Sequence, residues 1–174
     1  MIIGGVAGGA STAARLRRLD EQAEIILFEK GEYISYANCG LPYYIGGVIE
    51  ERERLFVQTP ESFKARFNIE VRIKSEVKAI EPENKQVVIK DWATGKTYRE
   101  SFDKLVLSPG AEPVLPPWEG IRTEGIFTLR NVADTDRIKA WAGRQEVKKA
   151  VVVGAGFIGL EMAENLHELG IQVT

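Results

Sequence analysis

The sequence predicts an α/β fold with a strand–turn–helix–strand unit at each end of the chain. Both units place a cluster of glycines between a short apolar run and a helix-forming segment, at residues 4–9 and 154–159. Between them, residues 70–102 contain segments typical of antiparallel strands, with a turn-forming Ala-Thr-Gly-Lys sequence at residues 93–96. These observations favour a parallel sheet that carries an antiparallel β-meander, followed by the start of a second parallel sheet.

The expected elements follow from apolar runs and from helix-forming composition. In the first part of the chain we expect strands at residues 1–3, 23–29, 70–77, 86–92, 97–102 and 104–107. We expect helices at residues 10–19 and 60–67, and a loop with a short helix at residues 31–47. In the last part we expect a strand at residues 150–153, a helix at residues 160–169 that ends at Gly170, and a strand from residue 171.

These elements divide the chain into three segments. We expect residues 1–112 to form the first, incomplete part of one domain, and residues 113–149 to form a connector and the start of a second domain. Residues 150–174 would then be the first β-α-β unit of that second domain. Because this unit stops inside its second strand, we expect the chain to be part of a longer protein.

Composition excludes several classes of protein. The 174 residues carry a net charge of −2, so no basic field favours a nucleic acid or an anionic membrane as partner. No apolar run is long enough to span a bilayer, and the N-terminus lacks the pattern of a signal peptide. The single cysteine forms no internal disulfide, and we therefore expect a reducing, cytoplasmic location.

The first glycine cluster has the context of a phosphate-binding turn. Such a turn brings the backbone and a helix N-terminus close to a pyrophosphate, and an acidic residue about 20 positions later binds the ribose hydroxyls. Glu29 occupies that acidic position, whereas Val6 stands where the consensus has its middle glycine, so we expect a locally different turn. The residues expected to contact this dinucleotide are Gly4, Gly5, Val6, Ala7, Gly8, Gly9, Glu29 and Lys30.

The second cluster matches the G-x-G-x-x-G pattern in full, and the residues expected to bind are Gly154, Gly156, Phe157, Ile158 and Gly159. The acidic residue that would separate NADH from NADPH lies beyond Thr174, so that choice stays open. Two dinucleotide turns in one chain indicate two cofactors. A tightly bound flavin, FAD, and a diffusible nicotinamide form the natural pair for hydride transfer.

Cys39 follows Glu29 by ten residues and precedes Gly40 and Pro42, which suit the first turn of a helix. A helix N-terminus favours the thiolate form of a cysteine, the form that attacks disulfides. The alternative is a buried structural thiol. Without a second cysteine, a redox role needs the flavin and an external thiol, or a sulfenic acid formed with oxygen.

Taken together, these motifs resemble the single-cysteine class of pyridine nucleotide-disulfide oxidoreductases, and most closely the branch that reduces coenzyme A disulfide or persulfides. The resemblance runs through residues 4–21, 28–43, 105–111, 128–131 and 151–166, and so covers almost the whole chain. Its most specific part is S-x-x-N-C-G-L-P-Y, because related NADH oxidases and peroxidases usually have serine where this chain has Asn38. The resemblance implies Rossmann-like domains for FAD and for NADH or NADPH.

The resemblance also implies roles for individual residues. Cys39 would be the nucleophile, and the residues matching coenzyme A contacts are Ser11, Arg15, Arg18, Ser35 and Asn38. The residues matching positions near the cofactors are Val77, Ser108, Pro109, Gly110 and Glu161. As alternatives, Arg15 and Arg18 would be ordinary solvated charges, and Glu161 an acid favoured by the helix dipole. A basic position of the family, near the end of the helix at residues 60–67, is occupied here by Phe67.

The expected activity is FAD-dependent reduction of coenzyme A disulfide, or of a coenzyme A persulfide or polysulfide, by NADH or NADPH. The resemblance also implies that the full-length protein is a homodimer. One alternative is an NADH oxidase or peroxidase acting through a Cys39 sulfenic acid. Another is a flavin-binding redox sensor without catalytic activity. The expected partners are a small disulfide or persulfide and a second copy of the protein, with no nucleic acid and no membrane.

Overall fold

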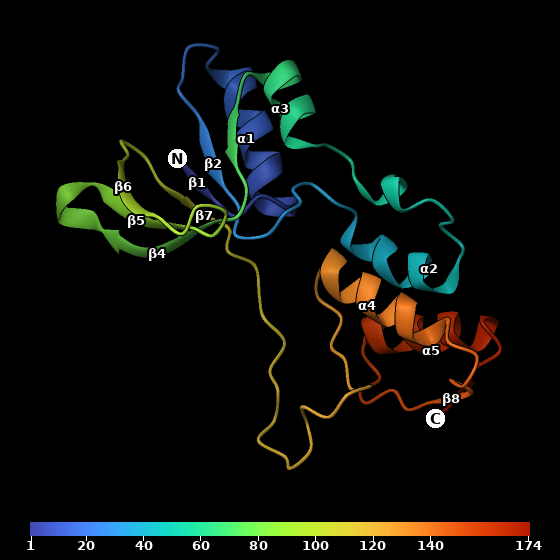
Figure 1. Cartoon of the computed structure of the whole chain (residues 1–174). Coiled ribbons are helices and arrows are strands. Elements are labelled where there is room, and N and C mark those ends of the chain that lie inside the picture. Colours follow the sequence, from blue (N-terminus) through green and yellow to red (C-terminus); the bar gives the residue numbers. More distant parts are fainter. The chain divides into compact units, whose positions relative to one another are not determined.

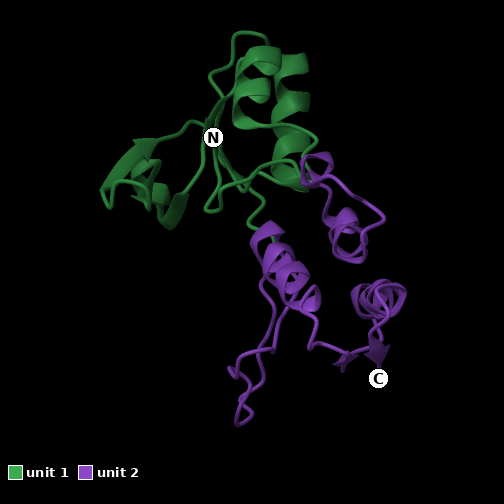
Figure 2. Ribbon diagram, turned by 45° about the vertical axis from the view of Figure 1, so that its right-hand side comes forward, with its two compact units in different colours: residues 1–36, 56–110 green, residues 37–55, 111–174 purple.

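A computed structural model describes all 174 residues, which form two compact units (Figures 1 and 2). Unit 1 comprises Met1–Tyr36 and Phe56–Gly110, and unit 2 comprises Ala37–Leu55 and Ala111–Thr174. Compact units of a chain need not coincide with its domains. The domain boundaries expected at residues 112 and 149 therefore remain a prediction.

Unit 1 contains a four-stranded parallel sheet in the order β3-β2-β1-β7. Its strands are β1 (Ile2–Ile3), β2 (Ile26–Phe28), β3 (Glu70–Arg72) and β7 (Val106–Leu107). Two helices, α1 (Ala7–Leu19) and α3 (Pro60–Phe67), lie side by side against it (Figure 1). An antiparallel meander follows in the chain, made of β4 (Ser75–Glu81), β5 (Gln86–Asp91) and β6 (Thr97–Ser101), with a 3₁₀ turn at Pro82–Asn84.

The parallel sheet separates two apolar cores, because successive side chains of a strand point to opposite faces. On the helical side, Ile2 and Leu27 pack with Ala10 of α1 and Phe63 of α3. On the other side, β2 contributes Ile26 and Phe28, which pack with Val87 and Ile89 of the meander. Unit 1 is thus built as helices, parallel sheet and meander, as the sequence predicts.

One expected strand of unit 1 was wrong. Residues 70–77 form two strands that belong to different sheets, β3 in the parallel sheet and β4 in the meander. The chain turns at Lys74, whose φ of 51° lies in the left-handed region. The Lys74 carbonyl accepts a hydrogen bond from the Trp92 amide. No glycine or proline marks this turn, so the apolar pattern looked continuous.

Unit 2 is built around three helices, α2 (Leu41–Gly46), α4 (Val132–Ala142) and α5 (Phe157–Glu168), and α2 packs against both of the others. The 3₁₀ turns Asn38–Gly40 and Arg52–Leu55 flank α2. The parallel strands β8 (Lys149–Ala150) and β9 (Gln172–Val173) complete the unit. Its buried core consists of Ile45, Ile138, Met162, Leu166 and Ile171.

Helix α4 is not among the elements that the sequence predicts, because residues 113–149 are interpreted there as a connector and the start of the second domain. A capping box begins this helix: the Asn131 side chain accepts the Asp134 amide at 3.0 Å. In return, the Asp134 carboxylate accepts the Asn131 amide at 3.2 Å. An Asn-x-x-Asp sequence satisfies the free amides of a helix start as Ser-x-x-Glu does. This Asn-x-x-Asp pattern is the feature of the sequence that indicates the start of α4.

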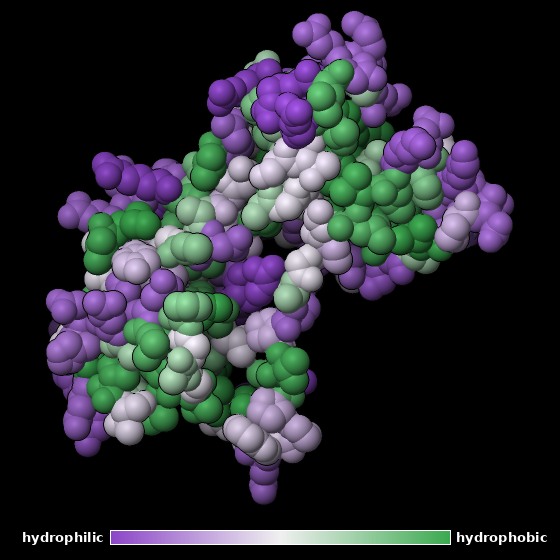
Figure 3. Space-filling view, turned by 180° about the vertical axis from the view of Figure 1, so that it is seen from behind, coloured by the Kyte–Doolittle hydropathy of each residue, from purple (hydrophilic) through white to green (hydrophobic).

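None of the helices is both long and apolar enough to cross a lipid bilayer. Apolar side chains nevertheless reach the surface of the molecule, as the green atoms in Figure 3 show. The most exposed of them belong to unit 2: Val114 at 90%, Phe157 at 89% and Val153 at 81%. The second glycine turn, at residues 154–159, therefore lies open to solvent together with the apolar residues beside it.

Candidate functional site

The first glycine turn joins β1 directly to α1 through two very close backbone approaches. Gly4 has a φ of +95°, and a Cβ at this position would lie 1.9 Å from the Ser108 carbonyl oxygen. A Cβ on Gly9 would lie 1.7 Å from the Gly4 carbonyl oxygen. Only glycine fits at either position, so these two residues set the geometry of the turn.

The start of α1 leaves a cradle for an anion. Val6 caps the helix without a side-chain hydrogen bond, and no acidic residue occupies the first turn. Ala7 and Gly8 are exposed, and Ser108 Oγ would lie 3.2 Å from a Cβ on Gly8. Free amides and the positive end of a 13-residue helix thus face an open surface, and these features fit the pyrophosphate of a dinucleotide.

The valine in this turn has an unusual backbone conformation. Val6 has a φ of −94° and a ψ of −121°, which lies outside the common β and α regions. Gly156, at the same position of the second turn, has a φ of −75° and a ψ of 175°. The two turns therefore differ locally, as expected, and the difference is mainly in the ψ angle at this position.

Glu29 lies at the end of β2 with both carboxylate oxygens placed by backbone amides. Its Oε2 accepts a hydrogen bond from the Gly5 amide, and its Oε1 accepts one from the Gly31 amide, both at 2.8 Å. Each carboxylate oxygen has a further lone pair. The side chain is therefore fixed beside the glycine turn and can still accept ribose hydroxyls, whereas the neighbouring Lys30 is exposed.

The residues after β7 belong to the same cradle. The Ser108 amide donates to the Ile3 carbonyl at 2.8 Å, which brings Ser108 against the glycine turn, and Pro109 and Gly110 follow exposed. Val77 lies elsewhere in unit 1, on β4 opposite Ile89, and packs against the core on the meander side of the sheet.

The second turn, in unit 2, repeats one close approach of the first, that of its last glycine to its first glycine. Gly154 has a φ of +110°, and a Cβ on Gly159 would lie 1.9 Å from the Gly154 carbonyl oxygen. Gly156 caps α5 without a side-chain hydrogen bond, and Phe157 and Ile158 are exposed. These residues fit a second dinucleotide.

Glu161, in the first half of α5, is half-buried, and its carboxylate has no hydrogen-bond or ion-pair partner. This carboxylate can therefore still accept a hydrogen bond from a ligand. His167, near the end of α5, is exposed, as its late position in the helix predicts.

Cys39 lies in the 3₁₀ turn Asn38–Gly40 that runs directly into α2, with Pro42 in the first turn of the helix as expected. The cysteine is exposed, which rules out the alternative of a buried structural thiol. Beside it, the Oδ1 atom of Asn38 is buried without a donor, and it is the one buried side-chain polar atom of the chain in this state. A buried acceptor without a partner costs about 1–3 kcal/mol, and a ligand donor would remove that cost.

A groove of about 300 Å³ on unit 1 runs beside α1 and contains two of the expected coenzyme A contacts, Ser11 and Ser35. It begins at Val6, next to the first glycine turn, and Phe63 and Phe67 of α3 line it as well. Phe67, which stands at a basic position of the family, therefore gives the groove an apolar wall. The sequence did not single out Phe63, because its spacing from Phe67 is that of an ordinary buried helix face.

The three arginines of α1 have different roles. Arg17 donates to the carbonyl oxygens of Phe67 at 2.8 Å and Asn68 at 3.0 Å, so its guanidinium joins the ends of α1 and α3. Arg15 and Arg18 are exposed and make no ion pair or hydrogen bond. They lie four and seven residues after Ser11, on the same helix face, and are available to an anionic ligand.

Comparison with known proteins agrees with this arrangement. All residues, 1–174, match the family model described as pyridine nucleotide-disulphide oxidoreductase. The chain belongs to this family. The coenzyme A disulfide reductase of Staphylococcus haemolyticus (strain JCSC1435) is 44% identical over 174 residues, which are 100% of this chain and 39% of that protein. The chain thus spans about two fifths of the length of this relative.

Solved structures of similar proteins share the fold. Reduced Bacillus anthracis CoADR-RHD is 58% identical with a TM-score of 0.97, over 99% of this chain and 31% of that one. An NAD-dependent persulfide reductase from A. fulgidus is 40% identical with a TM-score of 0.92, over 99% and 32% of the two chains. Membership of the oxidoreductase family confirms the resemblance and the Rossmann-like fold class, whereas the individual site residues remain predictions.

Proposed function

We propose that the protein is an FAD-dependent disulfide oxidoreductase that uses NADH or NADPH to reduce coenzyme A disulfide or a coenzyme A persulfide. The observation that carries this proposal is the exposed thiol of Cys39 at the start of α2, beside the buried and unpartnered Oδ1 of Asn38. A substrate that donates a hydrogen bond beside the reacting sulfur would satisfy this oxygen. Similarity to coenzyme A disulfide and persulfide reductases supports this substrate class.

The first glycine turn would hold FAD, with its pyrophosphate at the start of α1 and a ribose at Glu29. The second turn, at the start of α5, would hold the nicotinamide dinucleotide. When bound, FAD supplies the two electrons, taken from NADH or NADPH, that reduce sulfur at Cys39.

The chain's own contribution begins at Cys39. Its thiolate attacks one sulfur of the substrate disulfide: a bond forms between Cys39 Sγ and that sulfur, and the substrate S–S bond breaks. The other half leaves as a thiolate and takes up a proton from solvent. Two electrons and one proton then convert the mixed disulfide into the Cys39 thiolate and a second free thiol. Asn38 Oδ1 accepts a hydrogen bond from the bound half.

We assign the contacts with the remainder of the substrate to residues of unit 1. Ser11 and Ser35 offer hydroxyls within the groove beside α1. The free guanidinium groups of Arg15 and Arg18 suit phosphate groups, because guanidinium pairs with them in a bidentate way. Coenzyme A carries such phosphates at one end and its sulfur at the other.

The first half of this reaction can be tested without cofactors. We expect the reduced protein to release one equivalent of coenzyme A from coenzyme A disulfide and to retain the other half on Cys39, as intact-mass and peptide mass spectrometry would show. Cys39→Ser should form no adduct and release no thiol. An adduct formed equally fast with glutathione disulfide would contradict the substrate class. NADH consumption that requires only oxygen would favour an oxidase.

The arginines of α1 provide a test of the substrate's phosphates. Arg15→Gln and Arg18→Gln, each of which removes one cation, should slow the capture of coenzyme A disulfide by about tenfold, given 1.5–3 kcal/mol for a hydrogen bond to a charged group. Capture of pantethine, the disulfide that lacks the nucleotide, should not change. The rates are measured from thiol release.

Arg17→Gln is the matched control, because this guanidinium is engaged by carbonyl oxygens. It should lower the free energy of unfolding and leave the preference for coenzyme A disulfide over pantethine intact. Equal slowing of both disulfides by Arg15→Gln and Arg18→Gln would show that these residues do not bind the phosphates.

A further inference from the structure

Cys39 lies at one end of a very short helical segment. The 3₁₀ turn Asn38–Gly40 continues into α2, which ends at Gly46 after six residues. An isolated helix of this length is unstable in water, so its conformation depends on what holds it in place. Few residues separate the thiol from the carbonyl end of the segment.

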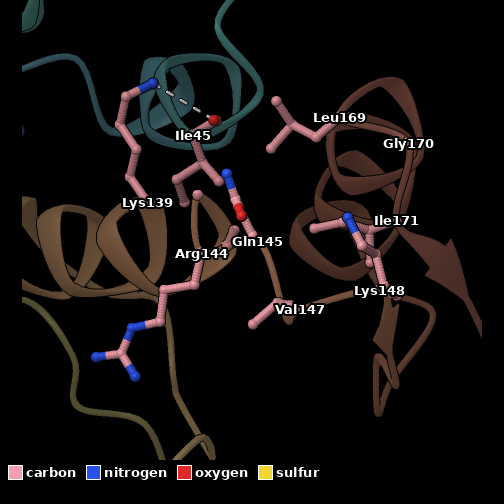
Figure 4. A pocket seen from close by; sticks show the side chains of 11 residues that line it. Ile45, Lys139, Arg144, Gln145, Val147, Lys148, Leu169, Gly170 and Ile171 are labelled. Atoms are coloured by element: carbon pink, nitrogen blue, oxygen red, sulfur yellow. Dashed lines mark hydrogen bonds between the residues drawn. The ribbon is translucent and has the colours of Figure 1, made fainter.

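The carbonyl end of α2 is held by a lysine from α4. The Lys139 ammonium group donates to the Tyr44 carbonyl oxygen at 2.5 Å and lies 3.5 Å from the Ile45 carbonyl oxygen. Figure 4 shows its side chain extending from α4 to α2, with the dashed line ending on the Ile45 oxygen. The same ammonium lies 4.3 Å from the centre of the Tyr44 ring, within range of a cation–π interaction.

This contact replaces hydrogen bonds that the helix cannot make itself. The last carbonyl groups of a helix have no partner within it and carry the negative end of its dipole. At Tyr44 the amide of Gly47 supplies one long bond, of 3.3 Å, and the lysine supplies the second. A cation at this end stabilises the helix through both charge and hydrogen bonding.

The polar partners of Lys139 are the carbonyl oxygens of Tyr44 and Ile45. No carboxylate forms an ion pair with it, and burial lowers the pKa of its ammonium group. It borders a hollow of about 430 Å³ that Arg144 and Lys148 also line, but in Figure 4 the three cationic groups point in different directions.

We propose that Lys139 is a positioning residue for Cys39, because its ammonium group holds the carbonyl end of the short helix whose other end carries the thiol. The inference rests on the proposed redox role of Cys39. The lysine does not touch the substrate. It keeps α2 helical up to its last turn, which maintains the orientation of Cys39 and the positive end of the helix dipole beside its sulfur.

The test is the rate of Cys39 alkylation by iodoacetamide at pH 7, measured on the 174-residue chain by mass spectrometry. Lys139→Met, which keeps the apolar stem and removes the ammonium group, should slow alkylation by about threefold, as expected for one charge at a helix end. Lys139→Arg should restore the rate, because it restores the cation. Lys139→Gln, a second neutral variant, gives the same comparison if the methionine variant does not fold.

Two controls separate positioning from general stability. Lys148→Met removes a nearby charge that does not reach α2, and Ile171→Val removes one methylene from the same core, so both should alkylate at the original rate. Unchanged alkylation in both neutral Lys139 variants, or equal slowing in Ile171→Val, would overturn the proposal. Capture of coenzyme A disulfide by Cys39→Ser would instead overturn the proposed function, and the alkylation result would be unaffected.

Discussion

Gly9→Ala is expected to abolish FAD binding and to lower the free energy of unfolding by about 3 kcal/mol or more. A Cβ at this position would lie 1.7 Å from the Gly4 carbonyl oxygen and 3.2 Å from Ile2 Cγ2, so α1 would have to move away from β1. Neither group is a flexible side-chain end, because one is backbone and the other belongs to a fully buried residue. Flavin absorbance after gel filtration and denaturant unfolding would measure the two effects.

Gly95→Ala is the matched control for this substitution. Gly95 lies in the hairpin turn of the meander with a φ of +74°, and no heavy atom lies within 4 Å of the position of its Cβ. The change therefore costs only the left-handed conformation of alanine, about 1–2 kcal/mol, and FAD should still bind. If Gly9→Ala bound FAD as well as Gly95→Ala does, the phosphate cradle would not lie at the first glycine turn.

The parts of the fold that were predicted correctly are those that depend on local chemistry. Glycine clusters between apolar runs mark both turns, and α3 has the bounds that Pro60 and Phe67 suggested. The division at Lys74 was missed because a lysine took a left-handed conformation without any local signal. Helix α4 was missed because its capping box uses Asn131 and Asp134 in place of the more common Ser or Thr and Glu.

The candidate site divides in the same way. Glu29 and the glycines were identifiable because phosphate and ribose binding restrict residue type at fixed spacing. Spacing could not show that Arg17 is engaged by carbonyl oxygens at the end of α3, whereas Arg15 and Arg18 are free. The same holds for Lys139, which lies 95 residues from the carbonyl group it binds. Such roles depend on tertiary packing and have no local pattern in the sequence.

Gly46→Ala is expected to lower the free energy of unfolding by about 3 kcal/mol, because it forces α2 away from α5. A Cβ on Gly46 would lie 2.1 Å from Oδ1 and 2.8 Å from Cβ of Asn165. That asparagine has little freedom to move, since it is 2% exposed and its Nδ2 donates to the Glu161 carbonyl oxygen at 2.8 Å. Denaturant unfolding should show the lower free energy of unfolding, and the alkylation rate of Cys39 should change as well.

The pair Gly46→Ala and Asn165→Ala tests whether the contact itself is responsible. Asn165→Ala alone loses one hydrogen bond and some packing, at a cost of about 1–2 kcal/mol. In the double variant the 2.1 Å clash with Oδ1 is removed and only the 2.8 Å approach to the Cβ of residue 165 remains. The two costs should therefore not add, and a favourable coupling of more than about 1 kcal/mol is expected. Strict additivity would contradict direct packing of Gly46 on Asn165. Because α5 starts at the second glycine turn and α2 starts beside Cys39, coupling here would mean that the proposed nucleotide-binding helix holds the cysteine helix in place.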